Sequence, residues 1–355
     1  MENRKSVFSY ALLPLAWLYD LVTRVRNCFY DCEIFKTTRP TVLTISVGNL
    51  TVGGTGKTPH VSFLVEFFRN QYQTSVLSRG YGRQTRGFIL AEAGATAQQI
   101  GDEPMLYHQK YGEQISVAVG EKRVEAVEKI ILARADTQLV ILDDAYQHRA
   151  LKTHINILLT DYERLFYTDF MLPFGRLREA QTGAKRADAV VVTKCDSAVS
   201  ESKKQAIQAQ IAIYTKKETP VFFSTVVYQN PVSYFENTVA LAENQPVVLV
   251  SAIAQPQLFE RAARGTFVVQ EHIVFKDHHN FSTKDLTKIL KSNLPILTTE
   301  KDMVKLKPLL LAQNSQSKTF YFWPIAVQFL ANQSTQSFEN WVLEQAHQKD
   351  PNFSL

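Results

Sequence analysis

A chain of 355 residues with 45% hydrophobic and 21% charged residues has room for two folded domains of unequal size, and this composition excludes a disordered protein. The formal net charge of +5 is small for the length and no RNA- or DNA-binding signature appears, so no nucleic-acid partner is expected. Cys28, Cys32 and Cys195 lie at no zinc spacing, and their odd number argues against a disulfide framework, which favours a reducing cytosol.

The N-terminal segment, 1–36, carries an uncharged run at residues 6–19 with basic residues on both sides. This run is too short to span a bilayer, which takes roughly 20 residues. Pro14 should mark a helix start or a kink. We expect an amphipathic helix at a membrane interface, and the alternative is a helix that docks on the protein's own core. The apolar positions that define the amphipathic face are Leu15, Leu18, Val22, Val25 and Phe29.

An apolar run at 41–47 leads into a glycine-rich stretch at 48–58, and apolar residues at helical spacing follow. This order of strand, loop and helix is typical of a P-loop, in which backbone N–H groups surround a polyphosphate. Lys57 is expected to reach the β/γ oxygens and Thr58 to bind Mg²⁺. The strict pattern has glycine at position 51. The candidate nucleotide-binding residues are Thr51, Val52, Gly53, Gly54, Thr55, Gly56, Lys57 and Thr58.

Short apolar runs alternate with helical stretches through the next part of the chain, which predicts a parallel sheet covered on both faces. We therefore expect an α/β fold: a P-loop NTPase-type α/β/α core at 37–228 and a smaller α/β domain at 229–355. The core strands are expected at 74–77, 115–119, 139–142, 155–159, 189–192 and 221–227. Those of the smaller domain are expected at 247–250, 267–275, 295–298 and 319–322.

Two acids, Asp143 and Asp144, follow the run 139–142 directly. Four apolar residues and then an acid form the second half of a P-loop site, because the strand delivers a carboxylate beside the loop to hold Mg²⁺ or its water. The pattern leaves open which of the two is the nearer Mg²⁺ partner.

Polar residues at other strand and helix ends are less specific. Arginines between glycines at 78–83 fit a ligand site at a strand end or a solvated turn. Asp102 in Gly-Asp-Glu-Pro reads, on spacing alone, as a helix N-cap. The Asp277-His278-His279 cluster fits a turn or an acid–base group, and a shared metal is the least expected of its readings.

Thr193-Lys194-Cys195-Asp196 resembles the guanine-reading element of P-loop GTPases. The matching Asp-x-x-Gly switch is missing, since Ala145-Tyr146-Gln147 follow the paired acids. The element keeps open a membrane-associated P-loop GTPase or metallochaperone. A third reading is a nucleotide-binding membrane module without catalysis.

Taken together and in order, these motifs resemble one family, the tetraacyldisaccharide 4′-kinases of lipid A biosynthesis. Thr51 is what this family carries at that position. Ala145 and Tyr146 depart from the family's usual Gly-Phe. The stretches that carry the resemblance are 46–59, 78–83, 101–104, 143–148, 175–179, 277–279 and 299–302.

The resemblance implies ATP, Mg²⁺ and transfer of the γ-phosphoryl group to the 4′-hydroxyl of tetraacyldisaccharide 1-phosphate, a lipid disaccharide monophosphate. The reaction would take place at the cytoplasmic face of the inner membrane. Nothing in the sequence itself points to an obligate protein partner. Asp102 and His278 would form a catalytic dyad that assembles when the two domains close, and Asp144 would assist catalysis. Thr58 and Asp143 would bind the metal. The arginines expected at the substrate are Arg79, Arg83, Arg123 and Arg178.

Overall fold

The computed structural model describes residues 10–235, 240–313, 319–331 and 336–350, and the chain divides into two compact units. The first unit comprises 1–79, 114–226 and 327–355, and the second comprises 80–113 and 227–326. Residues 80–113 thus belong with the smaller unit and 327–355 with the larger one, whereas the sequence predicts the reverse. The cause is packing between segments that are distant in the chain.

The first unit is built on a mainly parallel sheet with the strand order β14-β8-β7-β6-β1-β5-β2-β4. All pairs from β8 to β4 are parallel. β1, β2, β5 and β7 are buried along their whole length, as expected for strands covered on both faces. The strands are β1 (Leu43–Asn49), β2 (Thr74–Ser78), β4 (Ser116–Val119), β5 (Leu139–Asp143), β6 (Ile155–Asp161), β7 (Ala189–Thr193), β8 (Val221–Tyr228) and β14 (Ile325–Phe329).

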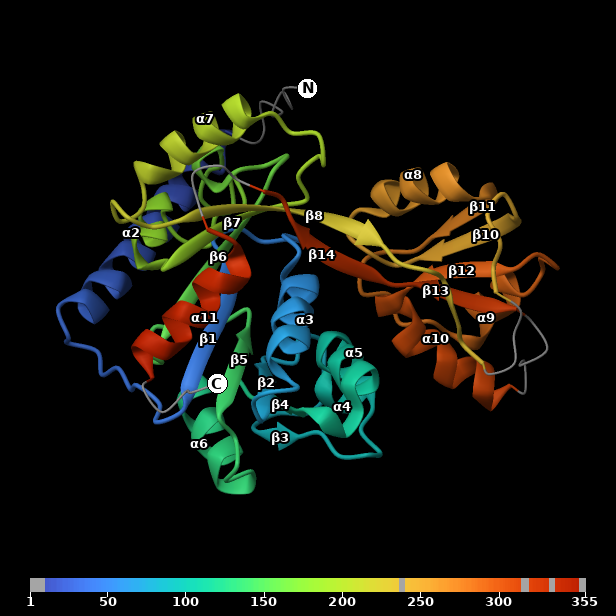
Figure 1. The fold of residues 1–355 in the computed structure, drawn as a ribbon, viewed down its shortest axis with the longest axis horizontal. Coiled ribbons are helices and arrows are strands. Elements are labelled where there is room, and N and C mark those ends of the chain that lie inside the picture. The colour runs from blue at the N-terminus through green and yellow to red at the C-terminus, as the bar shows by residue number, and fades with distance from the viewer. Residues whose placement is uncertain (1–9, 236–239, 314–318, 332–335, 351–355) are drawn as a thin grey trace. The chain divides into compact units, whose positions relative to one another are not determined.

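Helices lie along this sheet (Figure 1). Among them, α3 packs against β1 and β5, and α6 packs against β2 and β4. The ring of Phe338 in α11 lies 5.2 Å from that of Phe222 in β8, which ties the stretch 327–355 to the larger unit. The helices are α2 (Leu13–Asp31), α3 (Lys57–Phe68), α6 (Arg123–Ala133), α7 (Glu201–Ala212) and α11 (Phe338–Lys349), with 3₁₀ turns at Gly112–Gln114, Phe166–Thr168 and Gln181–Arg186.

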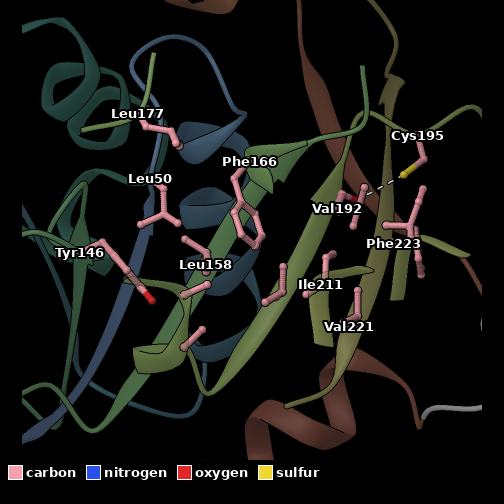
Figure 2. Packing of buried hydrophobic residues seen from close by; sticks show 14 residues of the cluster. Leu50, Tyr146, Leu158, Phe166, Leu177, Val192, Cys195, Ile211, Val221 and Phe223 are labelled. Atoms are coloured by element: carbon pink, nitrogen blue, oxygen red, sulfur yellow. Dashed lines mark hydrogen bonds between the residues drawn. The ribbon is translucent and has the colours of Figure 1, made fainter. Parts of the chain in front are cut away.

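One hydrophobic cluster of the first unit joins residues of β6, β7, β8 and α7 to Leu50, Tyr146 and Leu177 in the loops (Figure 2). Phe166 lies inside it, near Leu50 at the loop entry and Leu158 in β6. Cys195 belongs to the same cluster, and burial raises the pKa of its thiol to about 12. The loop entry is therefore held by a packed core.

The second unit is built on the sheet β11-β10-β12-β13-β9, which is parallel except for β9. Alternate residues of β10 face opposite sides: Val247 and Leu249 pack with α8, and Val248 and Val250 with α9 and α10. Figure 1 shows α8 on one side of this sheet and α10 on the other. The elements of this unit are β3 (Ile89–Leu90), α4 (Ala97–Ile100), α5 (Asp102–Tyr111), β9 (Val232–Ser233), β10 (Pro246–Ser251), α8 (Pro256–Thr266), β11 (Val268–Val274), α9 (Thr283–Ile289), β12 (Ile296–Thr299), α10 (Glu300–Ala312) and β13 (Phe320–Trp323).

The N-terminal helix α2 begins at Leu13 with Pro14 in its first turn, so the proline marks a helix start. Residues 6–9 of the uncharged run lie outside the described residues. Among the described residues, no helix is long and apolar enough to cross a membrane. Only Ala16 of α2 is buried. The five predicted apolar positions are all at least partly exposed, with Leu15 at 55% and Leu18 at 59%.

Candidate active site

The glycine-rich loop joins β1 to α3. Gly53 and Gly56 have φ values of 111° and 84°, a conformation that glycine adopts without strain. Gly56 is the N-cap of α3, so Lys57 and Thr58 are the first residues of the helix. Amides at a helix N-terminus and in a tight glycine loop form an anion-binding surface.

The paired acids end the neighbouring strand at the same edge of the sheet. Asp143 lies opposite Val47 in the parallel register of β5 and β1, and the Asp144 N–H donates to the Val47 carbonyl at 2.9 Å. Asp144 has a φ of 52°, an uncommon conformation for a residue other than glycine. Such backbone strain is typical of functional sites.

Cations surround Asp144. Arg178 Nη1 lies 2.8 Å from Asp144 Oδ1, and Lys57 Nζ lies 3.8 Å from Asp144 Oδ2. Burial alone would raise the pKa of Asp144, but Lys57, Arg178 and Arg123 together lower it. Asp144 is therefore a carboxylate at neutral pH, and the positive charges of Lys57, Arg178 and Arg123 all stabilise it.

Backbone pairing places Arg178. Thr51 and Leu177 form an antiparallel bridge, the Val52 N–H donates to the Arg176 carbonyl at 2.8 Å, and the Arg178 N–H donates to the Leu50 carbonyl at 2.7 Å. The segment 176–178 thus lies along the P-loop entry, which brings the Arg178 side chain to Asp144.

The other three predicted arginines have different surroundings. Arg123 is 2% exposed, and burial lowers the pKa of its guanidinium to about 10 although Asp143 and Asp144 oppose the shift. Its Nη1 donates to the Gly120 carbonyl, while Nε and Nη2 have no protein partner among the described residues. Arg79 is exposed. Arg83 belongs to the second unit and donates to the Gly87 carbonyl at 2.6 Å, whereas Arg79, Arg123 and Arg178 belong to the first unit.

The departure at positions 145 and 146 is accommodated locally. The left-handed residue of this turn is Asp144, so Ala145 does not need the freedom of glycine. The Tyr146 hydroxyl is buried and donates to the Gly183 carbonyl at 2.9 Å. A Cβ atom on Gly48 would lie 2.6 Å from Tyr146 Cβ, so the absence of a side chain at 48 lets β1 approach the turn.

In the second unit, Asp102 and His278 lie together. His278 Nδ1 lies 3.4 Å from Asp102 Oδ2. Gly101 is the N-cap of α5 and no side chain caps this helix, so the N-cap reading of Asp102 is wrong. Both residues belong to one unit, so the pair forms without the domain closure that the sequence predicts. His278 is a second candidate site residue with a positive φ, of 59°.

Two lysines of α10 complete this pair, and sequence reasoning missed both. Lys305 Nζ lies 2.6 Å from Asp102 Oδ2, and Lys301 Nζ lies 3.2 Å from His278 Nε2. Burial alone would raise the pKa of Asp102, but hydrogen bonds from His278 and Lys305 and the lysine charges lower it. The i, i+4 spacing of the two lysines, which places them on one helix face, could have indicated them.

Backbone contacts hold His278 in place. Its N–H donates to the Ala252 carbonyl at 3.3 Å, and the Ala252 N–H donates to Asp302 Oδ2 at 3.0 Å. Thr299, the N-cap of α10, also donates to Asp302 at 2.7 Å. The acid in Thr-Glu-Lys-Asp is thus a buried anchor for the histidine loop.

Elsewhere in the second unit, Ser251, His272 and Glu260 are hydrogen-bonded in the order of a hydrolase catalytic triad. Ser251 Oγ lies 2.8 Å from His272 Nε2, and His272 Nδ1 lies 3.0 Å from Glu260 Oε2. Ser251 is completely buried, however, so no acyl group can reach its hydroxyl. The array links β10, β11 and α8, and its role is structural.

The donors near the P-loop suit a hard cation. The Thr58 hydroxyl and the carboxylates of Asp143 and Asp144 are oxygen ligands, which Mg²⁺ prefers. No cluster of three or more His, Cys, Asp or Glu residues that could hold a metal occurs in the described part of the chain. Mg²⁺ takes one or two carboxylates and completes its shell with water and phosphate oxygens.

A parallel sheet with a glycine-rich loop before a helix, and an acid at the end of the adjacent strand, defines the class of P-loop nucleotide-binding proteins. Residues 8–347 match the family model described as tetraacyldisaccharide-1-P 4′-kinase, and the chain belongs to that family. Family membership decides against the GTPase, metallochaperone and non-catalytic readings.

Similar proteins agree. Tetraacyldisaccharide 4′-kinases from Cytophaga hutchinsonii and Flavobacterium psychrophilum are 40% and 38% identical to this chain over 91% of its length and over 92% and 93% of their own. The solved structure of LpxK from Aquifex aeolicus in complex with ATP is 25% identical, covers 97% of this chain and 99% of its own, and superposes with a TM-score of 0.75.

Proposed function

We propose that this kinase binds the phosphates of ATP with the P-loop and Asp144 of its first unit and uses the Asp102–His278 pair of its second unit on the lipid disaccharide. As a tetraacyldisaccharide 4′-kinase of lipid A biosynthesis, the protein is a phosphotransferase that uses ATP. The observation that carries the proposed site is the position of Lys57 beside Asp144, 3.8 Å apart at the carboxyl edge of the parallel sheet.

In this proposal the P-loop amides and Lys57 bind the β- and γ-phosphates. Arg178 and Arg123 add positive charge where the transferred group becomes most negative. The two free nitrogen atoms of the buried Arg123 support this role, because a buried guanidinium with unused donors suits an anionic oxygen. Arg79 and Arg83 remain candidates for the substrate phosphate.

Thr58 and Asp143 would hold Mg²⁺, with Asp144 as the other candidate. The ion would neutralise charge on the phosphate oxygens. Asp144 would keep Lys57 and Arg178 oriented toward the donor, since it forms ion pairs with both.

Asp102 would accept the proton of the attacking 4′-hydroxyl. A lysine ammonium has no lone pair and only donates, so Lys301 requires His278 Nε2 to accept and His278 Nδ1 to carry the hydrogen toward Asp102. His278 therefore orients the carboxylate, and Lys305 keeps it ionised. A weak base is sufficient, because the acceptor proton leaves late in a loose phosphoryl transfer.

Helix α2 would hold the enzyme on the membrane that contains its substrate, at the cytoplasmic face of the inner membrane. One side of α2 is attached to the core by polar contacts: Tyr19 donates to the Arg178 carbonyl at 3.0 Å, and Asn27 donates to Glu179 at 2.9 Å. Its apolar side chains are exposed, with Trp17 at 70%. An exposed apolar helix face with an interfacial Trp suits the headgroup boundary of a bilayer.

A pocket between α2 and the segment 169–181 is the place that we propose for part of an acyl chain. Its lining is mostly apolar, and Tyr19 links this helix to Arg178 at the P-loop entry. A lipid could therefore insert beside α2 while its sugar reaches toward the phosphates. The apolar lining includes Leu13, Trp17, Phe170, Met171, Phe174 and Leu177.

The test is transfer of ³²P from γ-labelled ATP to tetraacyldisaccharide 1-phosphate in mixed micelles, with wild type, Lys57→Met and Asp102→Ala side by side. We expect product from the wild type and a loss of orders of magnitude in both variants. Equal product from Lys57→Met would overturn the P-loop site, and equal product from Asp102→Ala would overturn the dyad.

A further inference from the structure

Three consecutive carbonyl groups of the P-loop accept hydrogen bonds from side chains outside the loop. Lys194 Nζ donates to the Gly54 carbonyl. Thr193 Oγ1 donates to the Thr55 carbonyl at 2.9 Å. His60 Nδ1 lies 2.7 Å from the Gly56 carbonyl oxygen.

These bonds fix the direction of the loop's amides. The two groups of a planar peptide point in opposite directions, so a carbonyl held outward turns the N–H of the next residue the other way. The carbonyls of Thr55 and Gly56 share their peptide planes with the N–H groups of Gly56 and Lys57, which lie at the start of α3 where an anion binds. Gly54 belongs to the turn in which the Thr55 N–H donates to the Gly53 carbonyl at 3.0 Å.

The three donors are themselves held firmly. Lys194 Nζ also lies 2.8 Å from Asp161 Oδ2. The backbone of Lys194 has a φ of 57°, a strained conformation that a residue other than glycine keeps only when the surrounding structure holds it. Thr193 is completely buried. His60 Nε2 lies 2.9 Å from the Ser224 hydroxyl.

The protonation of His60 follows from these contacts. A carbonyl oxygen only accepts, so Nδ1 carries the hydrogen and Nε2 accepts from Ser224. The imidazole thus links the Gly56 carbonyl to strand β8.

The side chains of Thr193-Lys194-Cys195-Asp196 all bond to backbone groups of the protein. The Lys194 amine is directed at the P-loop backbone, and Asp196 Oδ1 accepts from the Ala198 N–H at 2.9 Å within its own turn. We propose that Lys194, Thr193 and His60 are positioning residues that hold the P-loop in its phosphate-binding conformation and thereby set affinity for polyphosphate. This inference rests on the proposed P-loop site.

Inorganic tripolyphosphate is the probe that tests the role of Lys194, because it has phosphates and no base. Binding of MgATP, MgGTP and Mg-tripolyphosphate is measured by calorimetry for wild type, Lys194→Met and Lys194→Arg. We expect Lys194→Met to weaken all three by a common factor of about ten or more, the usual effect of losing a charged hydrogen bond, and Lys194→Arg to recover part of it. A changed ATP:GTP ratio with unchanged tripolyphosphate binding would show base reading and overturn the proposal.

Variants of Thr193 test the effect of a hydrogen bond to the loop without a change in charge. Thr193→Val removes the hydroxyl without changing charge, and Thr193→Ser keeps it. We expect Thr193→Val to raise the KM for ATP several-fold with the KM for lipid unchanged, and Thr193→Ser to restore it. Equal kinetics for both variants would contradict the proposal. A general folding defect would instead alter both KM values and lower the midpoint of unfolding.

Lys57→Met distinguishes a failure of the proposed P-loop site from a failure of the proposed positioning role. If it binds tripolyphosphate as the wild type does, the P-loop site and the positioning role both fall. If it fails to bind while Lys194→Met binds normally, only the positioning role falls. Lys217→Met, an exposed lysine on the same unit, controls for the loss of one positive charge.

Discussion

His278 Nδ1 lies 3.4 Å from Asp102 Oδ2, although 176 residues separate the two in the chain. Both belong to the second unit, and α5, which carries Asp102, packs against α10, which carries the lysines that bond to the pair. The proposed base and the histidine that orients it are thus positioned by one folded unit.

His278→Ala should lower kcat by about 10²-fold or more and leave the KM for ATP nearly unchanged, because a general base and its orienting partner act on the acceptor. The double variant with Asp102→Ala should be little worse than Asp102→Ala alone, since the two act together. His279→Ala is the control, because His279 bonds to Asp285 at 3.0 Å instead. Additive losses in the double variant would show independent roles.

Lys305→Met should move the acidic limb of the kcat/KM profile to higher pH. Lys305 contributes to the lowered pKa of Asp102, so removing its charge raises that pKa, and a larger fraction of Asp102 is then protonated at a given acidic pH. Profiles of wild type, Lys305→Met and the control Lys307→Met test this. If the acidic limb of the profile does not move, the ionisation that it reports is not that of Asp102.

Replacing Leu18 and Val22 by glutamate should lower binding to anionic vesicles at least about tenfold, because two apolar side chains that are 59% and 58% exposed can no longer enter the bilayer. Binding of ATP should not change. Leu132→Glu on α6 is the matched control, as Leu132 is 83% exposed on another helix of the same unit. Similar losses in the control would point to a non-specific charge effect.

Gly48→Ala should destabilise the protein by about 1–3 kcal/mol, because its Cβ would lie 2.6 Å from that of Tyr146 and the backbone must shift. Gly94→Ala should have no such effect, since nothing lies within 4 Å of the added atom. Denaturant unfolding of both variants gives the comparison. An unchanged midpoint for Gly48→Ala would mean that the turn relaxes freely.

Wild type should lose stability as the pH falls from 6.5 toward 4, and His60→Gln should lose less. The pKa of His60 is about 4 in the folded protein and about 6.5 in the unfolded chain. At pH values below 6.5 the unfolded chain therefore binds a proton that the folded protein does not, which favours unfolding. The full shift corresponds to about 3 kcal/mol at pH 4, and the term disappears above pH 6.5. Parallel pH curves for the two proteins would contradict this.

Much of the larger unit could be predicted from sequence. Its strands are buried on both faces and appear as continuous apolar runs, and the residues around Lys57 and Asp143 have a specific order. The role of Asp102 could not be predicted from local sequence patterns, because the residues around Gly-Asp-Glu-Pro do not indicate that their helix packs against α10. Lys301 and Lys305 were missed because a lysine on a helix is usually solvated. The Thr193–Asp196 element suggested base reading, since its pattern does not reveal that Lys194 bonds to a loop carbonyl.

The interleaved units also constrain how the protein is made. Residues 80–113 complete their unit only with partners at 227–326, and the larger unit takes α11 and the last residues of β14 from 327–355. As the chain leaves the ribosome, an early domain cannot finish before the later one has been synthesised. Helix α2, with its exposed apolar face, is by contrast among the first segments to emerge. We therefore expect a nascent chain that contacts lipid before it has a finished catalytic site, and whose stalled or truncated products lack both cores.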